Sequence, residues 1–245
     1  MPVQGVDVSK WQGEMSWLTC AHAGAKFALI RAGSIDNNTG QCYTDNQFKR
    51  NAELAPAAMS ATGYYWYFRP NHDPIKQADY FCALIQPIKT WRIYPACDIE
   101  ERGGKTPQTV SNAVMKFCDR VYINLKVKPM IYTSPGFWNT YVAPNPWAHL
   151  IKLWVAHWGV NKPTLPREWK EWLFWQTHVG QDGYQYGAQQ EGIDHDVYNG
   201  TWEEFTEEFC DGGGETVPLD SWIVDYAYPW MVQQGYSGPK PGGAK

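Results

Sequence analysis

The chain has 245 residues, a size typical of a single α/β barrel, and its 44% hydrophobic residues suffice for a sizeable core. The net charge of −4 gives no electrostatic reason to expect nucleic acid, and no segment approaches the ~20 apolar residues of a membrane span. The start, MPVQGVDVSK, lacks the basic and apolar stretches of a signal peptide. We therefore expect a soluble protein that begins in the cytoplasm, unless it has lost a leader.

Eight short apolar runs are strand candidates. In chain order they cover residues 3–9, 27–33, 62–68, 92–100, 128–134, 151–158, 171–177 and 191–198. Amphipathic stretches at 44–59, 74–88 and 107–125 fill the early gaps. Strands that alternate with helices indicate βαβ units in a parallel sheet, and eight such strands predict a barrel. Short gaps rich in Pro or Gly separate the last three strands, so we expect the barrel to be irregular at its C-terminal end.

Two helix starts have a clear signature. Asp73-Pro74 and Thr106-Pro107 each place a capping side chain before a proline at the first helical position. A last amphipathic helix is predicted at 201–209, and we take 1–210 as the barrel. Residues 211–245 form an aromatic, then Pro/Gly-rich extension, too short for an independent domain. We expect it to pack on the barrel, the alternative being contact with the substrate or a partner.

Carboxylates stand near the ends of the first, fourth and last predicted strands. Asp98 and Glu100 close the run RIYPACDIE, Asp7 follows VQGV, and Asp194 and Asp196 belong to the last run. Residues two apart in a strand share a face, and barrel enzymes place catalytic groups at the C-terminal ends of their strands. The first and last strands of a closed barrel are also neighbours. We therefore expect these acids to converge on one mouth, although each could instead merely end a strand or cap a helix.

A cluster of carboxylates has a recognisable use. Like charges repel, so at least one member keeps its proton near neutral pH, and a protonated acid beside ionised ones suits glycoside hydrolysis. A metal site is the competing use. None of the six His residues forms HxH, HxxxH or HExxH, which disfavours zinc, whereas a hard metal held by oxygens stays open. We predict no metal and no cofactor.

Aromatic and sulfur-containing residues allow two interpretations each. The 14 Trp, 15 Tyr and 9 Phe could fill a core or line a cleft that stacks on sugar rings. No pair of the six Cys has CxxC spacing, so we expect six free thiols, with Cys20 and Cys42 as the pair to watch.

Taken together, the strands resemble a known family. The segments GVDVSKWQG, FALIRAG, GYYWYFRP, ACDIE, PMIYTSPGFW, LWVAHWG, FWQT and GIDHDVYNGTWEEF are similar, in order and spacing, to those of family 25 glycoside hydrolases, the Chalaropsis-type lysozymes. The match covers roughly residues 3–209. It implies an irregular eight-stranded barrel with fewer helices, which cleaves the β-1,4 bond between N-acetylmuramic acid and N-acetylglucosamine in peptidoglycan.

The resemblance also implies roles for single residues. Glu100 matches the general acid, Asp98 its partner, Asp7 the first-strand acid and Asp194 the acid of the last strand. The family often has Asn at the position of Asp196, which leaves open whether Asp194 or Asp196 faces the cleft, and we favour Asp194. The residues implied to line the cleft are Tyr65, Tyr132, Trp154, Gln176 and Asp196. Trp66 stands where the family often has His, and it either alters the lining or only repacks it.

Three functional hypotheses follow. The first is a muramidase acting on bacterial peptidoglycan as a monomer, without nucleic-acid or membrane partners. It would be a phage endolysin, held in the host cytoplasm before reaching the wall, or a secreted enzyme. The second is a non-catalytic barrel that binds peptidoglycan, because a fold does not guarantee chemistry. The third is a metal-dependent deacetylase or amidase acting on the same polymer.

Overall fold

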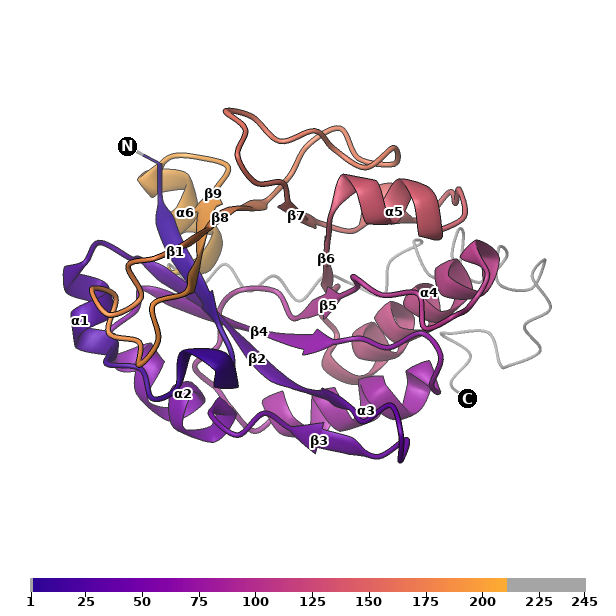
Figure 1. Ribbon diagram of the computed structural model, residues 1–245, viewed down its shortest axis with the longest axis horizontal. Helices are drawn as coiled ribbons and strands as arrows, with labels where there is room; N and C mark the ends of the chain where they lie inside the picture. Colours follow the sequence, from indigo (N-terminus) through magenta and orange to yellow (C-terminus); the bar gives the residue numbers. More distant parts are fainter. Residues whose placement is uncertain (1, 211–245) are drawn as a thin grey trace.

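The protein forms a closed barrel of eight strands, seen in a computed structural model that describes residues 2–210 (Figure 1). The barrel strands are β1 (Gln4–Val8), β2 (Phe27–Ile35), β4 (Ala61–Tyr67), β5 (Ala96–Asp98), β6 (Met130–Thr133), β7 (Leu153–Ala156), β8 (Phe174–Gly180) and β9 (Ile193–Tyr198). They are hydrogen-bonded in the order β1-β9-β8-β7-β6-β5-β4-β2, and β1 pairs with β2 to close the ring. Every predicted strand is present, so the prediction of an irregular barrel is confirmed.

The direction of the last strand differs from the prediction. All neighbouring barrel strands are parallel except those paired with β9, which runs antiparallel to both β8 and β1. A parallel connection needs a crossover, usually a helix, and residues 181–192 between β8 and β9 contain no helix. The expected parallel pairing therefore holds for the other barrel strands and fails for β9. The N-terminal end of β9, rather than its C-terminal end, reaches the barrel mouth.

Helices cover the barrel unevenly. They are α1 (Trp17–His22), α2 (Phe48–Leu54), α3 (Pro74–Ile85), α4 (Pro107–Leu125), α5 (Pro135–Tyr141) and α6 (Trp202–Phe209), with single 3₁₀ turns at Lys10–Gln12, Ala55–Ala57 and Ala148–Leu150. Helices α2, α3 and α4 lie along one side, where α2 and α3 pack on β2 and α4 packs on β5 (Figure 1). No helix lies between β7 and β8. This asymmetry is the expected irregularity of the barrel.

The predicted caps are present where the sequence places them. The Asp73 side chain accepts from the backbone N–H groups of Ile75 and Lys76, and Thr106 accepts from that of Thr109. Three short elements were not predicted: α1, α5 and β3 (Cys42–Thr44), which pairs antiparallel to β2. Segments of three to seven residues are too short to show a helical or strand period. The start of α5 nevertheless has the same signature, Ser134-Pro135.

The barrel interior is apolar at its base and polar at its mouth. Phe27 and Phe174 pack against each other inside, and Phe205 and Phe209 of α6 close the base against them. Gly5 lets Phe27 cross the interior, because a Cβ at residue 5 would lie 2.4 Å from that ring. A second, larger apolar core lies between the outer face of the sheet and the helices. Polar side chains can therefore gather only above the aromatic layer.

Three further expectations concern the cysteines, membrane-spanning helices and the C-terminal extension. All six cysteines are free thiols, Cys20 and Cys42 included. Within residues 2–210, no helix is long and apolar enough to cross a membrane. We also predicted that residues 211–245 pack on the barrel, and these residues lie outside the described range.

Candidate active site

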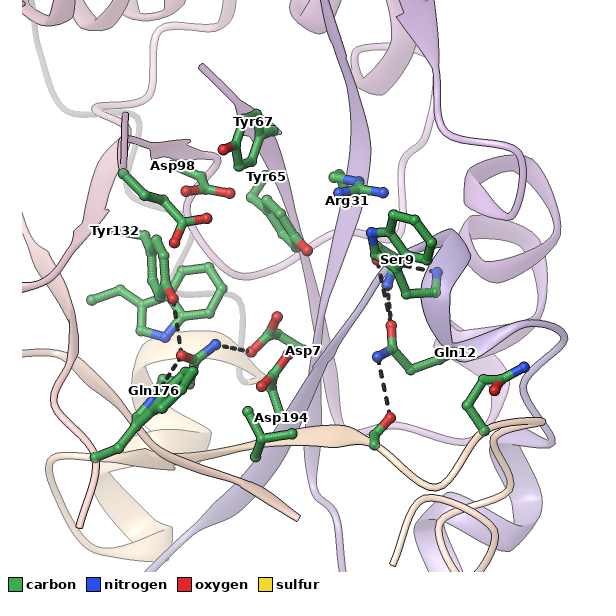
Figure 2. Close-up of a pocket in the computed structure, with 17 residues that line it drawn as sticks. Asp7, Ser9, Gln12, Arg31, Tyr65, Tyr67, Asp98, Tyr132, Gln176 and Asp194 are labelled. Atoms are coloured by element: carbon green, nitrogen blue, oxygen red, sulfur yellow. Dashed lines mark hydrogen bonds between the residues drawn. The ribbon is translucent and has the colours of Figure 1, made fainter. Parts of the chain in front are cut away.

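A pocket of about 480 Å³ opens at the mouth of the barrel (Figure 2). Its walls come from the C-terminal ends of the parallel strands and from the N-terminal end of β9. Seventeen residues line it, and they are Asp7, Ser9, Trp11, Gln12, Arg31, Tyr65, Tyr67, Asp98, Glu100, Tyr132, Trp154, Trp158, Gln176, Val179, Gln190, Gly192 and Asp194. The structure thus brings together all the predicted site residues except Asp196, which is buried and absent from this lining.

Asp98 and Glu100 stand together at the end of β5. Asp98 is its last residue, and Ile99 continues beside β6 by donating its N–H to the Tyr132 carbonyl. Asp98 is buried at 3% exposure, whereas Glu100 stays accessible to solvent at the mouth. Residues two apart in an extended segment share a face, and both side chains line the pocket, so the charge of Glu100 adds to burial in raising the pKa of Asp98. The pair is therefore built to hold a proton at the edge of the pocket.

Asp7 and Asp194 converge from two neighbouring strands. They are directly paired residues of the antiparallel β1–β9 ladder, so their side chains lie side by side on its inner face. Both line the pocket, as Figure 2 shows. Asp196 is one step deeper, where its Oδ1 accepts the Trp154 Nε1–H at 2.7 Å. Asp194, as favoured from the sequence, is thus the member of this pair that faces the pocket.

Gln176 connects the two halves of the acidic site. Its Oε1 accepts from the Tyr132 hydroxyl and from Trp158 Nε1, each at 2.9 Å, and its Nε2 donates to Asp7 Oδ2 at 2.7 Å (Figure 2). The indole N–H can only donate, so the oxygen of the amide must face Trp158 and its nitrogen must face Asp7. One side chain thereby fixes an acid, a tyrosine and a tryptophan.

Aromatic rings form much of the wall. Trp154 packs against Tyr132, with centroids 4.4 Å apart, and against Tyr65 at 5.7 Å. Trp11 and Trp158 line the pocket while remaining 67% and 53% exposed. Exposed tryptophan faces beside polar groups suit the apolar C–H faces and polar rims of sugar rings.

Sequence reasoning missed a cation in the pocket. Of the described residues that line it, Arg31 alone is positively charged. Its Nε and Nη2 contact Asp45 Oδ2 at 2.9 and 2.8 Å, and the Asp45 carboxylate is fixed by the backbone N–H groups of Lys10 and Gln47. The sequence did contain a signal for this cation, because Arg31 is the one charge in the otherwise apolar run FALIRAG. The structure shows that the strand formed by this run, β2, is buried along its whole length.

Alternation along β4 separates its aromatic residues. Tyr65 and Tyr67 point into the pocket, and Tyr67 was also missed although it lies two residues from Tyr65. Trp66 points away, is fully buried, and donates its Nε1–H to Gln77 Oε1 at 3.1 Å. Trp66 therefore repacks the outer core and does not alter the pocket lining.

The electrostatic environment of the site favours the protonated form of its carboxyl groups. Burial, and after it the charge of Glu100, raises the pKa of Asp98 well above its usual value, and partial desolvation of its carboxyl group raises the pKa of the solvent-accessible Glu100. Burial, with the charges of Asp194 and Asp196, raises the pKa of Asp7. Burial raises the pKa of Asp194 to about 6. In the part of the chain that is described, no group of three or more His, Cys, Asp or Glu is arranged to hold a metal ion.

A barrel whose mouth joins a proton-holding carboxyl pair, further acids and exposed aromatic rings is typical of glycoside hydrolases. Comparison with known proteins specifies the class. The profile of glycosyl hydrolases family 25 matches residues 6–185. The chain belongs to glycosyl hydrolase family 25 and is an enzyme of that family.

Individual relatives agree with this assignment. Lysozyme M1 of Streptomyces globisporus is 34% identical over 210 residues, which cover 81% of this chain and 68% of the relative. The N,O-diacetylmuramidase of a Chalaropsis species is 26% identical over 80% of this chain and 96% of its own length. Among solved structures, the bacterial lysozyme of Streptomyces coelicolor superposes with a TM-score of 0.72 at 28% identity, covering 85% of this chain and 97% of that one.

Proposed function

We propose that this enzyme is a muramidase, which hydrolyses the β-1,4 bond between N-acetylmuramic acid and N-acetylglucosamine in bacterial peptidoglycan, with Glu100 as the general acid. The observation that carries the proposal is the pair of carboxyl groups, Asp98 and Glu100, at the mouth of an aromatic-walled pocket. The names of the relatives, a lysozyme and a diacetylmuramidase, support the choice of substrate.

The reaction begins at Glu100. Its proton passes to the bridging oxygen as the bond from that oxygen to C1 of the muramic acid breaks. Positive charge then develops on C1 and the ring oxygen, and the carboxylates on the facing wall, Asp7 and Asp194, stabilise it electrostatically. Glu100, now ionised, is left to accept a proton from the water that completes hydrolysis.

Two retaining routes differ in what attacks C1. In one route a carboxylate is the nucleophile, and the acid and the nucleophile then stand about 5–5.5 Å apart. Asp98 and Glu100 stand two residues apart at the end of β5, on the same wall of the pocket and not on facing walls. This arrangement favours the other route, in which the acetamido oxygen of the substrate bonds to C1 while Asp98 accepts the amide N–H and orients the group. Water then attacks C1 and releases that oxygen.

The test is the identity of the new chain ends. Purified peptidoglycan is digested, reduced with borohydride and analysed by mass spectrometry. We expect N-acetylmuramitol at the new ends, and no loss of activity with a chelator. Ends that carry N-acetylglucosaminitol would identify a glucosaminidase instead. Release of peptides without new reducing ends, or loss of activity with the chelator, would favour an amidase or deacetylase and contradict the proposal.

A further inference from the structure

Arg31 is a cation in an acidic pocket, and the reaction described above does not use it. It lies on the inner face of β2, beside Tyr65 in the β2–β4 ladder, and its side chain is 11% exposed. Figure 2 shows it across the pocket from Tyr132 and Gln176. Removing a guanidinium from water is costly unless its donors find partners. The partners of its five N–H groups therefore indicate what the side chain does.

Asp45 occupies one edge of the guanidinium. Nε and Nη2 of Arg31 lie 2.9 and 2.8 Å from the same oxygen, Asp45 Oδ2. The Asp45 side chain is completely buried and accepts from the backbone N–H groups of Lys10 and Gln47. This pair therefore fixes the plane of the guanidinium and balances its charge.

The other end of the guanidinium is left open. Within residues 2–210, Nη1 of Arg31 takes part in no hydrogen bond, and Asp45 is the one ion-pair partner of the side chain. Arg31 also lines the pocket. It thus presents unused donors to the pocket in a fixed orientation, and a donor that is already fixed loses little entropy when it binds a ligand.

The chemistry of the pocket restricts the ligand group to a neutral acceptor. Four carboxyl groups line the same pocket and repel an anion, and Asp45 already balances the charge of Arg31. A guanidinium only donates hydrogen bonds, and an amide carbonyl oxygen only accepts them. A sugar hydroxyl also has a proton to donate, for which the carboxylates are the better partners. An acyl carbonyl oxygen of the substrate therefore suits Arg31 best.

The position of Arg31 narrows the choice of acyl group. Strand β4 separates β2 from β5, so the backbones at Arg31 and Asp98 are two strand spacings, about 10 Å, apart. The acetamido group that Asp98 orients at the cleaved bond is therefore not the group that meets Arg31. Two other acyl groups lie next to that bond. They are the acetamido group of an adjoining N-acetylglucosamine and the lactyl amide that joins muramic acid to its peptide stem.

We propose that Arg31 is a substrate-binding residue, whose Nη1 donates to one of these two acyl carbonyl oxygens. The contact selects acylated amino sugars over plain glucans, because a glucan leaves the donors of Arg31 without an acceptor. This inference rests on the proposed function and deepens it by naming the kind of substituent that the pocket recognises.

Substrates that lack one acyl group at a time test the contact. We would measure kcat/KM on three soluble preparations of peptidoglycan strands: intact, freed of stem peptides by an amidase, and N-deacetylated at N-acetylglucosamine. The variant is Arg31→Lys, which keeps the charge beside Asp45 but loses the second donor edge. The control is Arg120→Lys, because Arg120 forms a similar pair with Asp79 on the helices, outside the pocket. The control should stay within about three-fold of the wild type.

We expect Arg31→Lys to lose roughly ten- to hundred-fold on intact strands, the effect of one hydrogen bond to a charged group. If the partner is the acetamido carbonyl, the loss persists on peptide-free strands and shrinks to within about three-fold on N-deacetylated ones. If the partner is the lactyl amide, the loss persists on N-deacetylated strands. It then grows on peptide-free strands, where the lactyl carboxylate accepts a stronger bond.

Two results would overturn the proposal: a loss below about three-fold on intact strands, or an equal loss on all three preparations, which indicates a purely structural role. A wild type that does not hydrolyse intact strands contradicts the proposed function instead.

A crystal structure decides the question if Arg31→Lys does not fold. The Glu100→Gln variant retains Arg31 and can be crystallised with a tetrasaccharide of alternating N-acetylglucosamine and N-acetylmuramic acid. Nη1 of Arg31 should lie within about 3.2 Å of an acyl carbonyl oxygen. A sugar hydroxyl or only water at that distance would contradict the proposal.

Discussion

At the scale of single residues, Gln176 does most to organise the pocket. It is buried at 3% exposure and joins residues from β1, β6 and the segment after β7 through three hydrogen bonds. The sequence places it at the cleft by resemblance, but a hydrogen-bond network between strands far apart in the chain has no local signal. Substituting Gln176 should therefore affect the three residues that it bonds, Tyr132, Trp158 and Asp7.

We predict that Gln176→Leu lowers both stability and activity. The buried Tyr132 hydroxyl loses its acceptor and Asp7 loses a donor, so the free energy of unfolding should fall by about 1–3 kcal/mol. The value of kcat/KM should fall by roughly ten-fold or more as Asp7 loses its fixed orientation. Trp158→Phe is the matched control, because it keeps an aromatic, although smaller, ring and removes only one of the two donors to Gln176. Chemical denaturation and glycan hydrolysis measure the two effects, and a Leu variant no worse than Trp158→Phe would contradict the account.

At the scale of elements, α6 closes the base of the barrel while the reaction takes place at the mouth. Phe205 is fully buried, with ring centroids 5.6 Å from Phe27 and 5.1 Å from Phe209. Trp202, on the same helix, stacks on Phe205 but is 40% exposed. The helix therefore offers one structural and one peripheral aromatic residue for comparison.

We predict that Phe205→Ala lowers the free energy of unfolding by about 3–5 kcal/mol, because it leaves a cavity in the aromatic layer. Trp202→Ala should cost less than about 1.5 kcal/mol, since much of its surface is already in water. At a temperature where both variants are folded, kcat/KM should be close to that of the wild type. Denaturation midpoints and hydrolysis rates test this. Equal destabilisation by the two variants would show that α6 does not close the base as described.

The elements also mark how far the sequence alone predicts this fold. Eight apolar runs and two Pro-containing helix starts lead to the correct barrel strands and to α3 and α4. The antiparallel β9 is not predictable from those runs, because an apolar strand has the same pattern in either direction. The lack of a helix in 181–192 does not decide it either, because no helix joins β7 to β8 and that pair is parallel. The acids nevertheless meet at one mouth, since Asp194 is the second residue of the reversed strand, which begins there.

At the scale of the whole molecule, the acid cluster makes stability depend on pH. Burial raises the pKa values of Asp7, Asp98, Asp194 and Asp196, so the folded protein binds more protons than the unfolded chain above about pH 4. Stability then falls as pH rises, because ionisation of these groups is easier in the unfolded chain. The site thus carries a cost in stability at neutral pH.

We predict that the free energy of unfolding decreases between pH 4.5 and pH 7.5. Burial raises the pKa of Asp194 to about 6, and this group alone should contribute about 2 kcal/mol, at 1.36 kcal/mol per pKa unit and allowing for partial exposure. Asp194→Asn should flatten the slope by that amount. Asp36 and Asp79, whose pKa values are lowered, act in the opposite direction only below this range. Denaturant titrations across the range provide the measurement, and stability that rises with pH would contradict the prediction.

The central claim is that Glu100 supplies the proton for bond cleavage, and its neighbour offers the control. Glu101 follows it directly but is absent from the pocket lining. Its carboxylate is instead paired with Arg69 Nη1 at 2.7 Å. The most direct measurement is kcat/KM for release of reducing ends from soluble peptidoglycan strands by Glu100→Gln and Glu101→Gln. We predict a loss of roughly 10²–10⁴-fold for Glu100→Gln, the usual worth of a general acid, and a change of less than about five-fold for Glu101→Gln. A folded Glu100→Gln variant that cleaves as fast as the wild type would contradict the account.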